Sequence, residues 1–246
     1  MITDSLDVPL PRLFPLGDQA VVVEFGHTIN ETTHTSVCSF AAYLETYSLN
    51  GLIEYVPAFT TVTIYYDPWL LSDESKKDAY EEVCRLIHQV YPVIIPPLKH
   101  TARIVEIPVC YGGEYGPDLS LVANHTGLTQ EEVVNIHVSN DYLVYMIGFA
   151  PGFPYLGGMN PRIAAPRKAI PRTTIPAGAV GIAGRQTGIY PINTPGGWQL
   201  IGRTPLLLFD PSRQHPSLLK AGDMVRFIPI TEEKYLQARK EADIGY

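Results

Sequence analysis

Residues 148–205 read GFAPGFPYLGGMNPRIAAPRKAIPRTTIPAGAVGIAGRQTGIYPINTPGGWQLIGRTP, and this stretch decides the fold of the second half of the chain. Its 58 residues contain 11 of the 20 Gly and 9 of the 22 Pro. Such Gly density lets backbone approach a ligand closely, and Pro fixes the loops that hold it. The stretch therefore predicts a binding surface. The alternative is a loop-rich β fold whose turns simply need Gly and Pro.

The same region has an unusual charge distribution. Residues 142–209 contain no Asp or Glu but six Lys and Arg, whereas the rest of the chain carries 12 Lys and Arg against 25 Asp and Glu. In an acidic protein this predicts a local positive field that suits an anion. The overall net charge of −7 argues against general nucleic-acid binding.

Composition places the chain among ordered globular proteins. Its 246 residues, 46% of them hydrophobic, suffice for one large domain or two ordinary ones. We expect no signal peptide, because the first 18 residues have acidic residues and no apolar core segment, and no run is long enough to span a membrane. Three widely spaced Cys indicate reduced thiols in the cytoplasm. We expect no metal site, since the Cys lack the spacing of zinc ligands and no His pair has metal-ligand spacing.

Residues 1–92 predict an α+β domain. Hydrophobic periodicity gives, in order, strands at 12–16 and 19–25, a helix at 31–47, strands at 52–56 and 61–66, and a helix at 72–91. This order indicates a ferredoxin-like split β-α-β unit, with helices on one face of a mainly antiparallel sheet. The Pro-rich segment 92–100 is expected to end the second helix and to mark the domain boundary.

Residues 93–246 predict a second domain, a small barrel or sandwich of short strands. The expected elements are strands at 102–109 and 142–149, four short strands at 180–183, 188–192, 199–201 and 206–209, a last strand at 223–230, a helix near 118–125 and a helix from 231. Thr129 and Glu132 form a T-x-x-E capping box for another helix, which ends near Val138.

The candidate catalytic residues are His137 and Tyr145, which stand just before the Gly/Pro stretch. A neutral imidazole at the mouth of a loop-lined pocket could act as a general acid or base. The alternative for His137 is a histidine at a helix C-terminus, where the helix dipole favours the positive form. Tyr145 could donate a hydrogen bond from a pocket wall, but an aromatic residue on a strand often belongs to the core.

The candidate anion-binding residues are Arg172 and Arg185, because a guanidinium offers a rigid fork for a carboxylate. Each of them could instead form an ion pair within the fold. The segment Gly184-Arg185-Gln186-Thr187-Gly188 combines small, polar and basic groups and is the best single candidate for a ligand-contacting loop. The chain has no G-x-x-x-x-G-K-[ST], G-x-G-x-x-G or G-x-S-x-G motif, so it gives no reason to place an ATP site here.

Four motifs resemble the family of the 5-oxoprolinase B subunit, which includes a sporulation histidine-kinase inhibitor and proteins named allophanate hydrolase subunit 1. The motifs are PLGDQAVVVEFG at 15–26, CYGGEYGPDL at 110–119, the segment from His137 through Tyr145 to GFAPGFPYL, and VGIAGRQTGIYPINTPGGWQLIGRTP at 180–205. The resemblance implies a ferredoxin-like N-terminal domain and a cyclophilin-like β-barrel C-terminal domain. It also implies one half of a carboxyltransferase-type module, whose other half is the C subunit of the same enzyme.

In the full complex, to which an A subunit also belongs, the resemblance implies ATP-dependent opening of the lactam 5-oxoproline to glutamate, with no activity of this chain alone and with ATP bound by a partner. The positions that match the family are His137, Tyr145, Gly148, Phe149, Pro151, Gly152, Phe153, Pro154, Gly184, Gln186, Thr187, Gly188, Tyr190 and Arg203. With the residue chemistry, this predicts a substrate site made of Gly152, Phe153, Arg172, Gly184, Arg185, Gln186, Thr187 and Arg203.

Two other functions share these motifs. One is a regulatory protein that docks on a histidine kinase and blocks autophosphorylation, and the other is a half-module of a biotin-dependent carboxyltransferase. Exposed apolar residues would favour docking, and an open pocket lined by Arg185, Gln186 and His137 would favour chemistry. The carboxylate of the lactam gives the basic stretch an electrostatic partner, an idea that fails if Arg172 and Arg185 both pair with acidic residues of the fold.

Overall fold

The computed structural model describes residues 10–47, 51–72, 78–94 and 103–244. The chain divides into two compact units, Met1–Thr101 and Ala102–Tyr246. The sequence places the domain boundary at 92/93, which lies in the last turn of a helix, and the second unit begins nine residues later. Within the described ranges no helix is long and apolar enough to cross a membrane.

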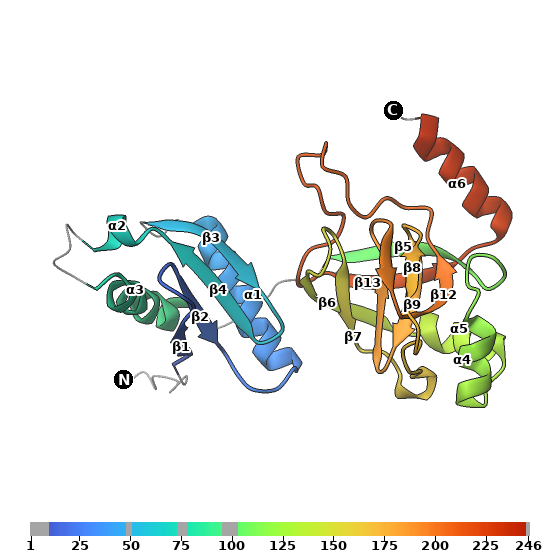
Figure 1. The fold of residues 1–246 in the computed structure, drawn as a ribbon, viewed down its shortest axis with the longest axis horizontal. Helices are drawn as coiled ribbons and strands as arrows, with labels where there is room; N and C mark the ends of the chain where they lie inside the picture. The colour runs from blue at the N-terminus through green and yellow to red at the C-terminus, as the bar shows by residue number, and fades with distance from the viewer. Residues whose placement is uncertain (1–9, 48–50, 73–77, 95–102, 245–246) are drawn as a thin grey trace, which may run out of the picture. The chain divides into compact units, whose positions relative to one another are not determined.

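The first unit is a four-stranded antiparallel sheet with two long helices (Figure 1). The sheet order is β1 (Arg12–Pro15), β2 (Ala20–Glu24), β4 (Thr61–Tyr66) and β3 (Leu52–Pro57). Every second residue of β4 is buried, which is the pattern of a sheet with one covered face. The helices α1 (Glu31–Thr46) and α3 (Ala79–Ile94) supply the apolar side chains on that face, among them Phe40 and Ile87.

Local sequence signals explain where these helices begin. Asn30 caps α1 as expected, because its side chain accepts a hydrogen bond from the Thr33 N–H at 2.8 Å. The expected helix at 72–91 is wrong at its start. Asp67 instead caps a short helix, α2 (Pro68–Leu71), which ends at Ser72. Residues 73–77 lie outside the described residues. At the other end the expectation that Pro92 ends the helix is not met, because α3 includes the exposed Pro92 and continues to Ile94.

The second unit is a closed seven-stranded barrel, which confirms the α+β class and the expected barrel. Its strands follow the order β10 (Gln186–Ile189), β7 (Pro154–Gly157), β6 (Asp141–Ile147), β13 (Met224–Pro229), β5 (Ile104–Tyr111), β12 (Gln199–Arg203) and β9 (Ala179–Ala183). β9 pairs with β10 and closes the ring. The pair β5 and β13 is parallel, and the other neighbouring pairs are antiparallel.

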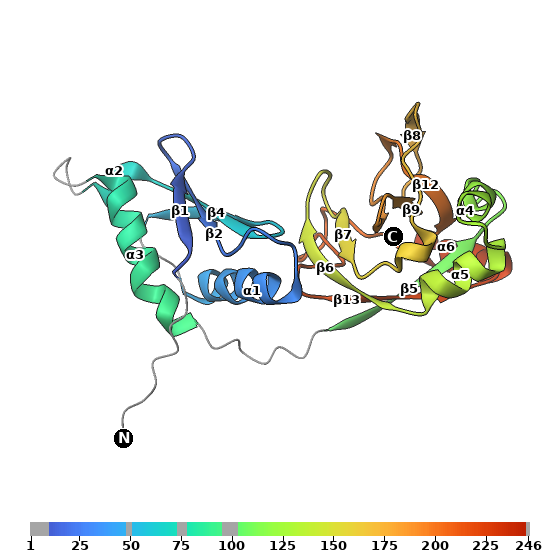
Figure 2. The same cartoon turned by 90° about the horizontal axis from the view of Figure 1, so that it is seen from below.

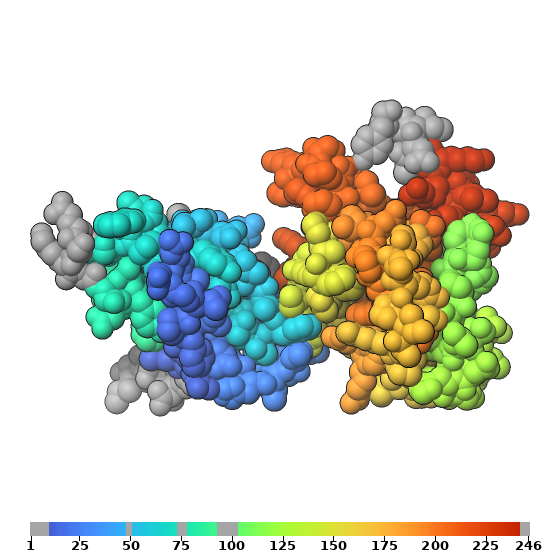
Figure 3. All heavy atoms as spheres, viewed as in Figure 1, coloured from blue at the N-terminus to red at the C-terminus, as the bar shows by residue number. Residues whose placement is uncertain are grey.

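Further elements surround the barrel. The helices α4 (Leu119–Thr126) and α5 (Gln130–Val138) contact one another, and α4 is packed on β12. Figure 3 shows the green atoms of this part of the chain beside the orange atoms of the barrel. The capping box of Thr129 and Glu132 is present in both halves and starts α5 as expected. A two-stranded ribbon of β8 (Arg172–Ile175) and β11 (Thr194–Gly196) projects from the barrel (Figure 2). A short 3-10 helix, η1 (Pro161–Ile163), and the helix α6 (Glu232–Ile244) complete the unit.

The expected strand at 206–209 is wrong. Leu208 is buried in the core of the barrel unit, and of this run only Phe209 forms an isolated bridge, to Ser217. The run is apolar because it packs on the barrel, not because it belongs to a ladder. Conversely, β7, β8 and β11 were not expected, because each has only three or four residues and two of them contain Pro.

Candidate functional site

His137 lies in the last turn of α5 and is completely buried. Its Nδ1 is 2.8 Å from the Tyr111 hydroxyl and its Nε2 is 2.9 Å from the Thr187 hydroxyl. Its ring also packs on Phe227, with centroids 4.5 Å apart. The side chain therefore fills the interior between the strands β5, β10 and β13, and both ring nitrogens have partners.

The tautomer of His137 follows from its partners. The Thr187 hydroxyl donates to the Gly181 carbonyl at 3.1 Å, and a carbonyl can only accept. The Thr187 oxygen therefore accepts a hydrogen bond from Nε2–H of His137, and Nδ1 accepts one from the Tyr111 O–H. Burial lowers the pKa of His137 to about 3, so the ring stays neutral at physiological pH.

This arrangement corrects two expectations for His137. The residue does not stand at the mouth of a pocket, where it could exchange protons with a substrate. Nor is its positive form favoured, because the loss of solvent outweighs the effect of the helix C-terminus. His137 is a hydrogen-bonded core residue, and Thr187 is its buried partner.

Tyr145 lies on β6 and is partly buried. Its ring covers Gly157, whose missing side chain makes this packing possible, since a Cβ there would lie 1.9 Å from Cε2 of Tyr145. Gly157 ends β7, and β7 pairs with β6. The Tyr145 ring thus packs directly on Gly157, one glycine of the GFPYLGG segment.

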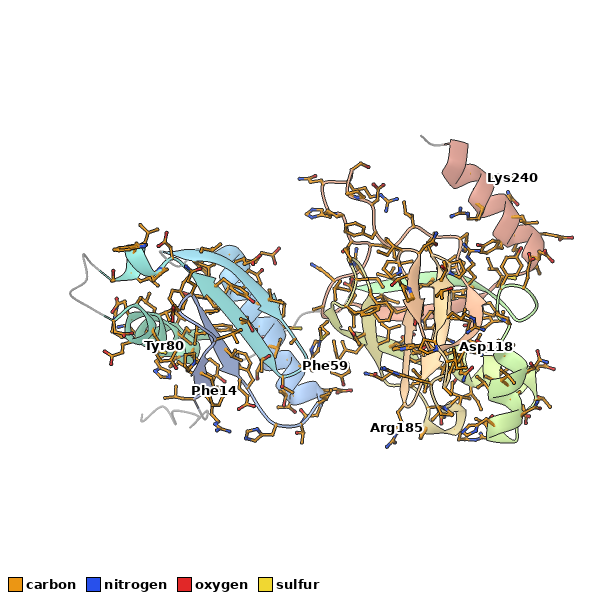
Figure 4. All side chains as sticks on the ribbon, viewed as in Figure 1. Phe14, Phe59, Tyr80, Asp118, Arg185 and Lys240 are labelled. Atoms are coloured by element: carbon orange, nitrogen blue, oxygen red, sulfur yellow. The ribbon has the colours of Figure 1, made fainter. Side chains whose placement is uncertain are left out.

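Of the predicted ligand-contacting loop, Gly184 and Arg185 form the turn between β9 and β10, whereas Gln186, Thr187 and Gly188 belong to β10. Gly184 turns with a φ of +58°, a conformation that suits glycine, and Arg185 is exposed at the tip. Figure 4 shows the Arg185 side chain pointing away from the barrel. Gln186 is partly buried. The turn therefore presents Arg185 outward, whereas Thr187, two residues on, faces the core.

Phe153 and the glycine before it lie in a buried aromatic cluster. The Phe153 ring makes edge-on contacts with Tyr190 at 5.3 Å and with Trp198 at 5.6 Å. Gly152 has a φ of +79°, and a Cβ there would lie 2.8 Å from Phe209. Both residues therefore shape the loop, and Phe153 is buried rather than open to a ligand.

Two of the predicted arginines are held within the fold. The Nη2 of Arg172 donates to Asp118 at 2.8 Å, and the Nε of Arg203 donates to the Ala177 carbonyl at 2.9 Å. Arg172 therefore forms the ion pair within the fold that the sequence left open as its alternative, and its charge is partly neutralised. No ion pair of Arg185 is found among the described residues, so the charge match with an anion is not excluded.

Asp118 is a site residue that the sequence did not reveal. It is buried, and its carboxylate accepts hydrogen bonds from Leu200 N at 2.8 Å, Arg172 Nη2 at 2.8 Å and Lys168 Nζ at 3.2 Å. Burial opposes its ionisation, but the hydrogen bonds from Arg172, Leu200 and Lys168 outweigh burial and keep its pKa below the usual value. Figure 4 places it at the start of α4, among the barrel side chains.

A signal for Asp118 was present in the motif CYGGEYGPDL. An Asp after Gly-Pro at a helix start is typical of an N-cap residue, and this local pattern does not indicate a contact with distant cations. In the structure Asp118 is the N-cap residue of α4, but its side chain makes no capping hydrogen bond. The carboxylate is used for the two cations instead.

Two exposed apolar residues stand on loops of the same unit. Phe149 is 68% exposed and Ile170 is 83% exposed. Phe149 also has a φ of +71°, which costs energy for a residue with a side chain. The Phe149 ring packs edge-on against Phe153, with the ring centroids 5.5 Å apart. Ile170 is followed by Pro171, whose Cγ lies 3.7 Å from the position that a Cβ of Gly197 would take. Such residues supply the apolar surface that a protein partner needs.

The arrangement offers cations, hydroxyl groups and apolar surface, but no exposed nucleophile–base pair among the described residues. Those residues also contain no group of three or more His, Cys, Asp or Glu side chains that could hold a metal ion.

Comparison with known proteins gives the same family over most of the chain. The model of the carboxyltransferase domain, subdomain C and D, matches residues 11–219. The chain is 51% identical to the 5-oxoprolinase B subunit of Bacillus subtilis (strain 168) over 93% of its length and 96% of that protein. It is 42% identical to the 5-oxoprolinase B subunit of Escherichia coli O157:H7 over 90% of its length and 97% of that protein.

A solved structure supports the fold. The crystal structure of TTHA0988 matches with a TM-score of 0.74 and 38% identity, over 86% of this chain. The chain spans only 40% of the length of that solved chain. The region similar to this protein is thus one part of a longer polypeptide there.

Proposed function

The chain belongs to the family of carboxyltransferase domains, subdomains C and D, and on that premise we propose that it is the B subunit of a 5-oxoprolinase. The enzyme would open the cyclic amide of 5-oxo-L-proline to give L-glutamate. The observation that carries the proposal is the 51% identity to the Bacillus subtilis protein across nearly the full length of both chains. A cytoplasmic location is part of the same proposal.

We propose that the chain acts only with partner proteins, which the family resemblance names as the A and C subunits of 5-oxoprolinase. Two observations support this. The described residues offer no exposed catalytic pair, and His137 is buried in its neutral form. The exposed Phe149 and Ile170 give a partner an apolar surface to cover.

ATP hydrolysis would drive the reaction, because the family resemblance implies it. We propose that ATP binds to one of the partner proteins. This proposal is supported by the sequence, which contains neither G-x-x-x-x-G-K-[ST] nor G-x-G-x-x-G, the Gly-rich motifs of known phosphate-binding loops.

The finer fold assignment belongs to the same proposal: a ferredoxin-like first domain and a cyclophilin-like barrel. The first is supported by the sheet order β1-β2-β4-β3, in which β2, α1 and β3 form a split β-α-β unit around β4. The strand β1, which precedes this split β-α-β unit in the sequence, pairs with β2 and forms the edge of the sheet. The closed barrel with flanking helices supports the second.

Within the proposed enzyme, this chain would bind and orient the anionic lactam. The carboxylate-free stretch 142–209 supplies the positive charge, with Arg185 exposed at the β9–β10 turn and Gln186 beside it. Gly152 and Phe153 are buried, so in this proposal they fix the geometry of the surrounding loops and do not contact the ligand.

The test is reconstitution. The purified chain would be mixed with its candidate A and C subunits, 5-oxo-L-proline and ATP, and glutamate release would be followed. We expect glutamate only when all three proteins are present. A properly formed complex that releases no glutamate would overturn the proposal and direct attention to binding of a histidine kinase.

A further inference from the structure

The Asp118 side chain does not cap the helix that it precedes and instead contacts distant residues. As the N-cap residue of α4 it is placed to accept a hydrogen bond from the first turn of the helix, and it makes none. Its carboxylate is instead aimed at the backbone N–H of Leu200 and at the cations of Lys168 and Arg172. The same oxygen, Oδ1, serves both cations.

One carboxylate does not satisfy two cations. Lys168 carries three N–H donors and Arg172 five, and only one from each reaches Asp118. The Nη1 of Arg172 is buried and has no partner among the described residues. The side chains of Lys168 and Arg172 are each 26% exposed. The cluster thus has one excess positive charge, spare donors and a route from solvent.

The backbone around the cluster is fixed on several sides. Lys168 N donates to the Gly197 carbonyl at 2.7 Å, and the Gln199 amide donates to the Pro166 carbonyl at 2.9 Å. Arg172 pairs with Gly196 where β8 meets β11. Residues 166–172 are therefore held between Asp118 and the segment 196–200, so the two cations have a defined separation.

We infer that Asp118 is a positioning residue that holds Lys168 and Arg172 as a receptor for a single carboxylate group of a small ligand. A ligand carboxylate would balance the excess charge and accept from the spare donors of both cations. If a carboxylate oxygen of the ligand reached the buried Nη1 of Arg172, it would also give this nitrogen the hydrogen-bond acceptor that it lacks. The identity of the ligand as 5-oxo-L-proline rests on the proposed function.

The binding test uses Trp198, which is buried and directly follows Gly197, whose carbonyl accepts a hydrogen bond from Lys168 N. The chain has two Trp, and the other, Trp69, is 80% exposed in the first unit. A Trp69→Phe protein would therefore report through Trp198 alone. It would be titrated with 5-oxo-L-proline and with 2-pyrrolidinone, which has the same lactam ring but no carboxylate.

We expect a saturable change in fluorescence with 5-oxo-L-proline and none with 2-pyrrolidinone. Asp118→Asn and Lys168→Met would each raise the dissociation constant at least tenfold, and Lys168→Arg would restore most of the affinity. The matched control is Asp223→Asn, which removes another buried carboxylate paired with an arginine, Arg103, in the same unit. Its affinity should stay within twofold.

Equal responses to both ligands, or no response to either, would overturn the inference. So would unchanged affinity in Lys168→Met, a variant with a partly exposed side chain that tests the idea even if Asp118→Asn fails to fold. An equal loss in Asp223→Asn would reduce Asp118 to a structural residue.

The reconstituted complex separates this inference from the proposed function. Lys168→Met should raise KM for 5-oxo-L-proline at least tenfold and change kcat less than threefold. If the complex with Lys168→Met released glutamate with an unchanged KM, the carboxylate receptor would be disproved and the proposed function would not be affected. Glutamate release that does not need this chain would remove the proposed function, and the fluorescence titration would then decide on the receptor alone.

Discussion

The Nε2 atom of His137 lies 2.9 Å from the hydroxyl oxygen of Thr187, although the two residues are 50 positions apart in the sequence. The contact joins the last turn of α5 to β10, and Tyr111 of β5 completes a chain of hydrogen bonds from the other side of the ring. Two residues that the sequence suggests for catalysis and substrate binding thus satisfy each other inside the barrel.

The first prediction concerns the acid stability of this core. The pKa of His137 in the folded state, about 3, lies below its ordinary value of 6.5, so the unfolded state binds more protons between these values. The stabilisation is fully present above pH 6.5 and is lost as the pH falls toward 3. Near pH 5 this group should lower the free energy of unfolding by on the order of 1 kcal/mol for each unit by which the pH falls.

Urea unfolding of the wild type and of His137→Gln at pH 7, 6 and 5 would measure this slope. His137→Gln should be less stable at pH 7, because Tyr111 and Thr187 lose a well-placed partner, but its stability should depend less on pH. His215→Gln, which changes an exposed histidine in the same unit, is the control. Equal pH dependence in all three proteins would contradict the assignment.

The second prediction concerns Gly157 and Tyr145. A Cβ at position 157 would lie 1.9 Å from the Tyr145 ring, so Gly157→Ala should destabilise the protein by about 2–3 kcal/mol. In a Tyr145→Ala background the same substitution should cost less than about 1 kcal/mol, because the ring that it meets is gone. Denaturant unfolding of the four proteins gives the coupling, and additive effects would show that the ring does not cover this glycine.

The third prediction concerns the backbone at Phe149. Its φ of +71° suits glycine, so Phe149→Gly should be more stable than Phe149→Ala by about 1 kcal/mol. Both variants remove an exposed ring, and both should weaken assembly with the partner proteins. Thermal unfolding measures the effect on stability, and size-exclusion chromatography of the mixed proteins measures assembly. Normal assembly of both variants would show that Phe149 does not contribute to docking.

The fourth prediction concerns Arg185. Because its side chain is exposed and has no ion pair among the described residues, Arg185→Ala should leave the free energy of unfolding within about 0.5 kcal/mol of the wild type. In the reconstituted complex it should lower kcat/KM for 5-oxo-L-proline at least tenfold. Arg162→Ala, at another exposed arginine of the same unit, should change neither quantity. Activity of Arg185→Ala within twofold of the wild type would remove this residue from the site.

Signals that act over a few residues predicted the local structure well. Asn30 and the Thr129–Glu132 capping box placed two helix starts correctly, because a cap depends only on neighbouring residues. The predicted start of α3 was wrong because Ser72 looked like a cap. Asp67 caps the separate short helix α2, and at the start of α3 the Asp78 side chain accepts a hydrogen bond from Glu81 N at 3.0 Å. The run at 206–209 failed for a different reason: apolar residues that pack on a barrel resemble those of a strand.

The site was harder to predict because its contacts join distant segments. Asp118 lies 50 and 54 positions from Lys168 and Arg172, and no local pattern reveals such a pairing. The burial of His137 depends on three strands whose packing the sequence does not state. Arg185 was predicted to lie in a ligand-contacting loop from its small and polar neighbours, and the structure places it exposed at a turn that begins with Gly184.

The parallel pairing of β5 with β13 has a consequence for synthesis of the protein. β5 is the first strand of the barrel and β13 the last, and β13 lies between β5 and β6. Until residues 224–229 have left the ribosome, the other six strands can form only an open sheet with β5 and β6 as its free edges. Free edges invite pairing with other chains. A nascent or prematurely terminated chain should therefore be prone to aggregate until the last strand closes the ring.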